Sequence, residues 1–88
     1  MEYEWNEAKN AANQAKHGVA FAAVYRFDWK SAIVRADLRF AYPEIRLIAV
    51  GLIERRLHVL VFILRRWIRV ISLRRASNKE IERYEAEN

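Results

Sequence analysis

The feature that most constrains the fold of this chain is a strand-like repeat of hydrophobic residues that begins at residue 31. The repeat predicts four strands, over residues 31–37, 44–53, 57–64 and 68–74. Only the short connections Glu54-Arg55-Arg56 and Arg65-Arg66-Trp67 separate the last three strands. We therefore expect these strands to pair as antiparallel neighbours in one sheet.

The residues before this block predict a short strand, over residues 2–5, and two helices. Asn6 fits the N-cap of a first helix, which ends at Gly18, a residue free to adopt a positive φ angle. A second helix is expected over about residues 20–27. The apolar stripe of the first helix consists of alanines, namely Ala8, Ala11, Ala12 and Ala15.

The last residues predict a third helix, over residues 77–87. Ser77 supplies its N-cap, and Glu80 completes a capping box. The resulting order is α-α-β-β-β-β-α, which predicts an α+β fold with helices packed on an antiparallel sheet. A chain of 88 residues has room for one small domain, residues 1–88, with a thin core.

The composition excludes several classes of protein and site. The chain has no cysteine, which excludes a disulfide scaffold, a thiolate nucleophile and a zinc–thiolate site. Its two histidines, His17 and His58, lack clustered carboxylates and do not predict a metal site. The apolar stretch 57–64 is far shorter than the roughly 20 residues that cross a membrane, and the N-terminus does not resemble a secretion signal. We expect a soluble, cytoplasmic protein.

Positive charge is concentrated in the middle of the chain, whose net charge is +5. Between Arg46 and Arg75 there are eight arginines and one acid, Glu54. Arginine binds phosphate in a bidentate fork, so this block indicates a polyanion or an acidic protein as partner. Arginines at hairpin ends also keep an apolar sheet in solution, so the charge alone does not choose between binding and solvation.

Several short motifs, in this order and spacing, resemble a known family. The first half carries Trp5-Asn6-Glu7-Ala8-Lys9, Asn13 and Lys16-His17-Gly18-Val19-Ala20-Phe21. The second half carries Ile68-Arg69-Val70-Ile71-Ser72-Leu73-Arg74-Arg75-Ala76, Glu80 and Arg83-Tyr84. Together they resemble the BrnT family of bacterial type II toxins, small ribonucleases of RelE-like fold, over nearly the whole chain. Members of that family usually have glycine in both hairpin connections and a threonine near position 63. This chain has neither.

The resemblance implies a toxin that cuts RNA without a metal or other cofactor and stops translation. It also implies a BrnA-like antitoxin, which would be the only part of the complex to bind operator DNA. The departures from the family pattern favour a second hypothesis, a catalytically inactive member that acts as a binding module in such a complex. Because of these departures we also expect Ile63, Leu64 and Trp67 to form an exposed apolar surface, which would bind a partner or a second copy of the chain.

RNA cleavage without a metal needs a base for the 2′-hydroxyl, cations for the phosphorane and an acid for the departing 5′-oxygen. By resemblance, the matching positions are Lys9, Lys16, His17, Glu44, Arg46, Arg69, Ser72, Arg74 and Tyr84. The residues assigned to catalysis are His17, Glu44, Arg46, Arg69 and Arg74. Those assigned to RNA binding are Lys9, Lys16, Arg75 and Tyr84.

These assignments have structural alternatives. His17 titrates near neutral pH, yet a histidine at a helix end often only bonds the last carbonyls. Glu44 and Arg46 share a face of the expected strand, either as a base with its cation or as a surface ion pair. Arg69 and Arg74 are five residues apart and point to opposite faces, unless a bulge or the strand end re-aims Arg74, the preferred phosphate clamp.

Overall fold

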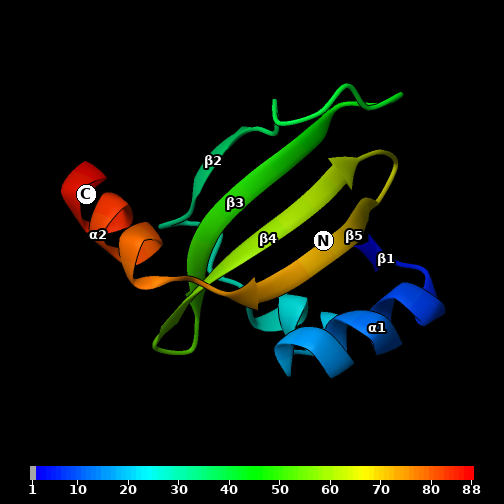
Figure 1. The fold of residues 1–88 in the computed structure, drawn as a ribbon, viewed down its shortest axis with the longest axis horizontal. Coiled ribbons are helices and arrows are strands. Elements are labelled where there is room, and N and C mark those ends of the chain that lie inside the picture. Colours follow the sequence, from blue (N-terminus) through cyan, green and yellow to red (C-terminus); the bar gives the residue numbers. More distant parts are fainter. Residues whose placement is uncertain (1) are drawn as a thin grey trace.

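The computed structural model describes residues 2–88, and a five-stranded sheet in the order β1-β5-β4-β3-β2 lies at its centre (Figure 1). The strands are β1 (Tyr3–Glu4), β2 (Ile33–Ala36), β3 (Arg46–Ile53), β4 (Arg56–Leu64) and β5 (Ile68–Arg75). The helices are α1 (Glu7–His17), the 3₁₀ helix η1 (Phe21–Arg26) and α2 (Asn78–Glu87). This arrangement confirms the predicted α+β fold, with β1 added in parallel to β5.

The three long strands form two antiparallel hairpins, as predicted, but β2 and β3 are shorter than expected. β2 starts at Ile33 because the Asp28 carboxylate accepts a hydrogen bond from Ser31 and holds this residue in a turn. β3 starts at Arg46, so Glu44 lies in the loop before the strand.

One face of the sheet, here called the inner face, packs against α1 and η1 and carries the core. The largest fully buried side chains are Phe21, Leu60, Leu73, Val24 and Val70. The second helix, expected over residues 20–27, is the 3₁₀ helix η1. Its tighter turns still bring Phe21 and Val24 into the core.

The side of α1 that faces the sheet is polar, and the predicted alanine stripe is wrong. Ala8, Ala11, Ala12 and Ala15 are all exposed, whereas Asn13 is buried. The Asn13 amide donates to the carbonyls of Leu73 at 2.7 Å and Val19 at 2.9 Å, and its oxygen accepts from the Leu73 amide at 3.3 Å. β1 pairs only with the first residues of β5, so the backbone at Leu73 needs partners from α1.

The predicted helix ends are confirmed. Asn6 caps α1 by accepting from the Lys9 amide, and Gly18 ends the helix with a φ angle of 73°. Ser77 and Glu80 form the capping box of α2. None of the helices in residues 2–88 is long and apolar enough to cross a membrane.

The hairpin between β3 and β4 turns without the glycine that is usual in the family resembled. Glu54 adopts the left-handed conformation instead, with a φ angle of 57°. Gly51, three residues earlier, is required by packing: a Cβ atom there would lie 2.7 Å from the ring of Phe27.

A β-bulge at Ile71 interrupts β5. Val70 and Ser72 pair with consecutive residues of β4, so Ile71 is an extra residue that reverses the alternation of side chains along the strand. Arg69 and Arg74 consequently point to the same face, although they are five residues apart. This is the outer face of the sheet, opposite the core.

Candidate active site

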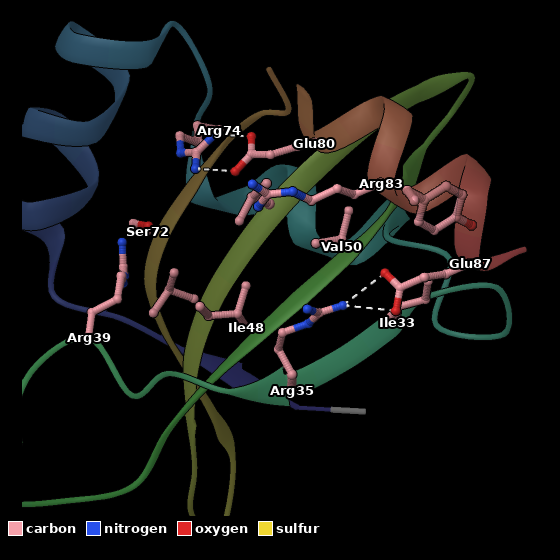
Figure 2. Close-up of a pocket in the computed structure, with 13 residues that line it drawn as sticks. Ile33, Arg35, Arg39, Ile48, Val50, Ser72, Arg74, Glu80, Arg83 and Glu87 are labelled. Atoms are coloured by element: carbon pink, nitrogen blue, oxygen red, sulfur yellow. Dashed lines mark hydrogen bonds and ion pairs between the residues drawn. The ribbon is translucent and has the colours of Figure 1, made fainter. Parts of the chain in front are cut away.

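A cleft of about 270 Å³ lies between the outer face of the sheet and α2 (Figure 2). Its floor is apolar and consists of Ile33, Ile48, Val50, Val59 and Val61. Its polar lining consists of Arg35, Arg39, Ser72, Arg74, Glu80, Arg83, Tyr84 and Glu87. Four arginines from four separate segments therefore converge on one cleft, an arrangement suited to a phosphodiester.

Arg74, near the end of β5, is held by Glu80 from the first turn of α2. Its Nη1 and Nη2 donate to the two carboxylate oxygens at 2.8 and 2.9 Å, and Nη1 also donates to the Arg75 carbonyl at 3.2 Å. Glu80 also accepts from the Ser77 amide at 2.7 Å, so the capping box of α2 helps to fix Arg74. The hydrogen bonds from Arg74 lower the pKa of Glu80 to about 2, so this carboxylate stays charged at neutral pH.

Two more arginines of the cleft are paired with carboxylates. Arg35 donates through Nη2 to both oxygens of Glu87, at 2.9 and 3.2 Å. Arg39 donates to both oxygens of Asp37, at 2.8 and 2.9 Å. The hydrogen bond from Arg39 lowers the pKa of the buried Asp37 to about 2. Asp37 therefore orients Arg39 and does not exchange protons near neutral pH.

The fourth arginine, Arg83, extends from α2 toward the cleft (Figure 2). Among residues 2–88, no carboxylate lies within ion-pair distance of it, so its charge is available to a ligand. The next residue, Tyr84, lines the cleft and donates its hydroxyl to the Ser31 carbonyl at 2.7 Å. Tyr84 thus attaches α2 to the segment before β2.

His17 ends α1 and is half-buried. Burial lowers the pKa of its imidazole, and the charges of Lys16 and Arg74 lower it further. His17 does not line the cleft; it lies one turn of α1 after Asn13, whose amide bonds Leu73, the residue before Arg74. A lowered pKa keeps the imidazole neutral near pH 7, which is the form that accepts a proton.

A second depression, of about 490 Å³, adjoins the cleft on the outer face. It is lined by Lys9, Glu44, Ile45, Arg46, Ile63, Leu64, Arg65, Arg69 and Ile71. Arg46 stacks over the Tyr42 ring at 3.9 Å and lies 3.6 Å from Glu44. The expectation that Glu44 and Arg46 share a strand face is wrong, because Glu44 lies in the loop. Their ion pair forms at the start of the strand instead.

The structure divides the residues predicted from the sequence among four places. Ser72, Arg74 and Tyr84 line the cleft, while Lys9, Glu44, Arg46 and Arg69 line the second depression. Lys16 and His17 lie at the end of α1, and Arg75 lines a third depression with Arg55 and Arg56. The bulge puts Arg69 on the face of Arg74, but their β4 partners are four residues apart, or about 13 Å. These two arginines therefore cannot clamp the same phosphate.

Sequence reasoning missed Arg35, Arg39 and Arg83 as parts of the cleft. A signal existed for Arg35, which alternates with Ile33 on a strand and so shares its face. Arg83 belongs to a motif named above but received no role. Arg39 lies in the loop between β2 and β3, where no periodic pattern predicts the direction of a side chain.

His58, the second histidine, has no place in either depression. It is buried on the inner face of β4, and its Nδ1 lies 2.8 Å from the Arg56 carbonyl. Burial lowers the pKa of this imidazole. In the part of the chain that the structure describes, no three His, Cys, Asp or Glu side chains are grouped as metal ligands.

Comparison with models of known families gives a match over most of the chain. Residues 5–80 match the model of the ribonuclease toxin BrnT of type II toxin–antitoxin systems. The chain belongs to the BrnT family. A search of curated proteins finds no match.

Membership in the BrnT family confirms the resemblance seen in the sequence motifs. BrnT proteins are ribonuclease toxins of type II toxin–antitoxin systems, so family membership implies RNA cleavage and an antitoxin partner. The match ends at Glu80, which holds Arg74, so Arg83, Tyr84 and Glu87 of the cleft lie beyond it.

Proposed function

We propose that this BrnT chain is an endoribonuclease of the mRNA interferase type whose active site is the cleft between the outer face and α2. It cuts RNA without a metal ion and inhibits translation in the cytoplasm. A BrnA-like antitoxin neutralises it, and the complex binds operator DNA through the antitoxin. The observation that carries this proposal is the convergence of Arg35, Arg39, Arg74 and Arg83 on one cleft.

Arg74 is the phosphate clamp of this proposal. Its guanidinium has five N–H donors, and the hydrogen bonds to Glu80 and the Arg75 carbonyl use three of them. Two N–H donors of Arg74 have no partner in the part of the chain that the structure describes, one on Nε and one on Nη2. They lie side by side on one edge of the guanidinium. Such an edge can bind two oxygens of a phosphate while Glu80 keeps the group in place. Glu80 is a positioning residue, because it acts through Arg74.

His17 is the general base of this proposal, because its lowered pKa keeps it neutral near pH 7. It accepts the proton of the 2′-hydroxyl, whose oxygen attacks the adjacent phosphorus. The bond to the 5′-oxygen breaks and this oxygen takes up a proton from water, which leaves a 2′,3′-cyclic phosphate and a 5′-hydroxyl end. Arg74 and Arg83 stabilise the charge that builds up on the phosphorane.

The other residues assigned from the sequence stay predictions. Arg46, Arg69 and Glu44 line the second depression and not the cleft, so this mechanism gives them no step. Lys9, Lys16 and Arg75 are predicted to attract RNA phosphates.

The proposal is tested by incubating the purified chain, free of antitoxin, with total RNA in the presence of EDTA. We expect cleavage, and ends that carry a cyclic phosphate. Arg74→Ala should lower the rate about 10²–10³-fold, the usual cost of a lost transition-state contact. Arg55→Ala, at an exposed hairpin tip, is the matched control and should change the rate only slightly, because its attraction to RNA is screened.

The second candidate is a binding module without catalytic activity. One observation favours it: Arg35, Arg39 and Arg74 are each already paired with a carboxylate of the chain. A folded protein that cleaves no RNA at any pH would support this candidate. Equal losses in the Arg74→Ala and Arg55→Ala variants would show that the arginines act only as a diffuse field.

A further inference from the structure

The apolar side chains that remain exposed gather at one end of the molecule. In the part of the chain that the structure describes, seven large hydrophobic residues are exposed, and five of them belong to the loop between β2 and β3 or to the β4–β5 hairpin. These five, here called the apolar rim, are Leu38 (87% exposed), Phe40 (67%), Ile45 (77%), Leu64 (65%) and Trp67 (39%). The sequence predicted exposure for Leu64 and Trp67, but Ile63 is buried.

The apolar rim borders the second depression. Ile45 and Leu64 line the depression itself; Ile45 precedes Arg46 and Leu64 follows Ile63, the pair at the end of the β3–β4 ladder. Phe40 is connected to the same place, because its ring contacts Tyr42, which stacks on Arg46. Loop and hairpin therefore present one surface, although almost 30 residues of sequence separate Leu38 from Trp67.

The charge of this surface is unbalanced. Lys9, Arg46, Arg65 and Arg69 line the depression, and Glu44 is the one acid among the residues that line it. Glu4 lies nearby but is shared, at 3.3 Å from Arg69 and 4.0 Å from Arg65. The cleft differs, because three of its four arginines have a carboxylate of their own. An occupant of the second depression must therefore bring negative charge.

We propose that the second depression and the apolar rim form the docking surface for the antitoxin. The antitoxin segment that binds there carries aliphatic or aromatic side chains flanked by aspartate or glutamate. This inference rests on the partner that BrnT membership implies, and it does not depend on the proposed catalytic mechanism.

Two other occupants fit the surface less well. RNA gains from cations and from aromatic rings, but the exposed aliphatic side chains Leu38, Ile45 and Leu64 match neither its phosphates nor its stacked bases. A second copy of the chain would bring the same arginines against each other, which opposes a symmetric dimer. Burial of aliphatic side chains beside cations that outnumber the neighbouring carboxylates suits an acidic, amphipathic protein segment.

The position of this surface explains how an antitoxin bound there can neutralise the toxin although it does not contact Arg74. Ile71 lines the second depression and Ser72 the cleft, so the two sites are neighbours along β5. A protein segment bound in the second depression blocks one approach of a long RNA to the cleft. It leaves the arginines of the cleft unoccupied.

The test measures binding of the purified product of the reading frame next to the toxin gene, by calorimetric titration. Ile45→Asp and Leu64→Asp should each weaken binding at least about 30-fold, as expected for central anchors of an interface. Val34→Asp is the matched control, since Val34 is an exposed aliphatic residue on the opposite face, and it should change the affinity less than about threefold. Arg65→Glu should weaken binding more than Arg55→Glu, and added salt should reduce this difference.

RNA cleavage by the same variants separates this inference from the proposed catalysis. Ile45→Asp and Leu64→Asp should cut RNA at the rate of the unchanged chain, while Arg74→Ala should lose cleavage and keep antitoxin binding. The inference is overturned if the neighbouring gene product does not bind, or binds both rim variants as tightly as the control. It is also overturned if the rim variants lose RNA cleavage, which would identify an RNA site. The lone chain could also form a dimer that dissociates in the Leu64→Asp variant while antitoxin binding stays unchanged. That result would assign the surface to self-association and would overturn the inference too.

Discussion

Replacement of Asn13 by alanine tests how α1 is joined to the sheet. The Asn13 side chain makes three hydrogen bonds, two of them with the backbone of Leu73, a residue that is fully buried. Alanine fills the helix position without strain but cannot donate or accept. The amide and carbonyl of Leu73 would then lose their partners in a place that water does not reach.

The expected loss of stability follows from these contacts. A typical hydrogen bond contributes about 1 kcal/mol net, and a buried group left unpaired costs about 1–3 kcal/mol. The three contacts of Asn13 therefore predict a decrease of about 3 kcal/mol in the free energy of unfolding. This is a large fraction of the total for 88 residues, which is about 4–13 kcal/mol.

Urea unfolding followed by circular dichroism measures this change. The midpoint for Asn13→Ala should fall by about 1–3 M at an unchanged slope. Gln14→Ala is the control, because Gln14 is an exposed residue of the same helix, and its midpoint should stay close to that of the parent. One hydrogen bond contributes about 1 kcal/mol net. If Asn13→Ala lowers the free energy of unfolding by less than this, the view that Asn13 takes the place of a neighbouring strand at Leu73 is refuted.

Three further changes test other parts of the structure. Because folding lowers the pKa of Glu80 from 4.5 to about 2, its pairing with Arg74 stabilises the fold above pH 4.5 and is lost as the pH falls toward 2. Acid unfolding of Glu80→Gln should lack this part of the pH dependence, and an unchanged acid profile would contradict the pairing. Glu54→Gly should raise stability by about 1 kcal/mol in thermal unfolding, since glycine adopts the positive φ angle without strain, and a lower melting temperature would count against this account. Gly51→Ala should lower stability by about 1–3 kcal/mol because its Cβ collides with Phe27, and a neutral result in urea unfolding would show that the ring moves freely.

The sequence predicts the sheet, its hairpins and the helix ends because these depend on local patterns. The period of apolar residues in β3, β4 and β5 and the capping residues Asn6 and Ser77 each act over a few positions. The inner side of α1 could not be predicted in this way. Asn13 is buried because Leu73, 60 residues away, lacks a strand partner on the β1 side of β5, and an alanine stripe is the usual choice when no such contact is known.

The candidate site was predicted only in part for the same reason. The motif around Arg74 identified the residue and the end of the strand where it lies. Its neighbours in the cleft come from β2, from a loop and from α2, and the sequence does not show that these segments meet. Lys9, Glu44, Arg46 and Arg69 line the neighbouring depression instead.

The bulge at Ile71 makes the pairing of one residue as important as the composition of β5. If Ile71 paired as an ordinary strand residue, every side chain after that point would change face. Leu73 would leave the core, and Arg74 would enter it. The second half of β5 therefore presents its arginine to solvent only while this one residue stays out of the ladder, because the evenly paired strand would bury a charge.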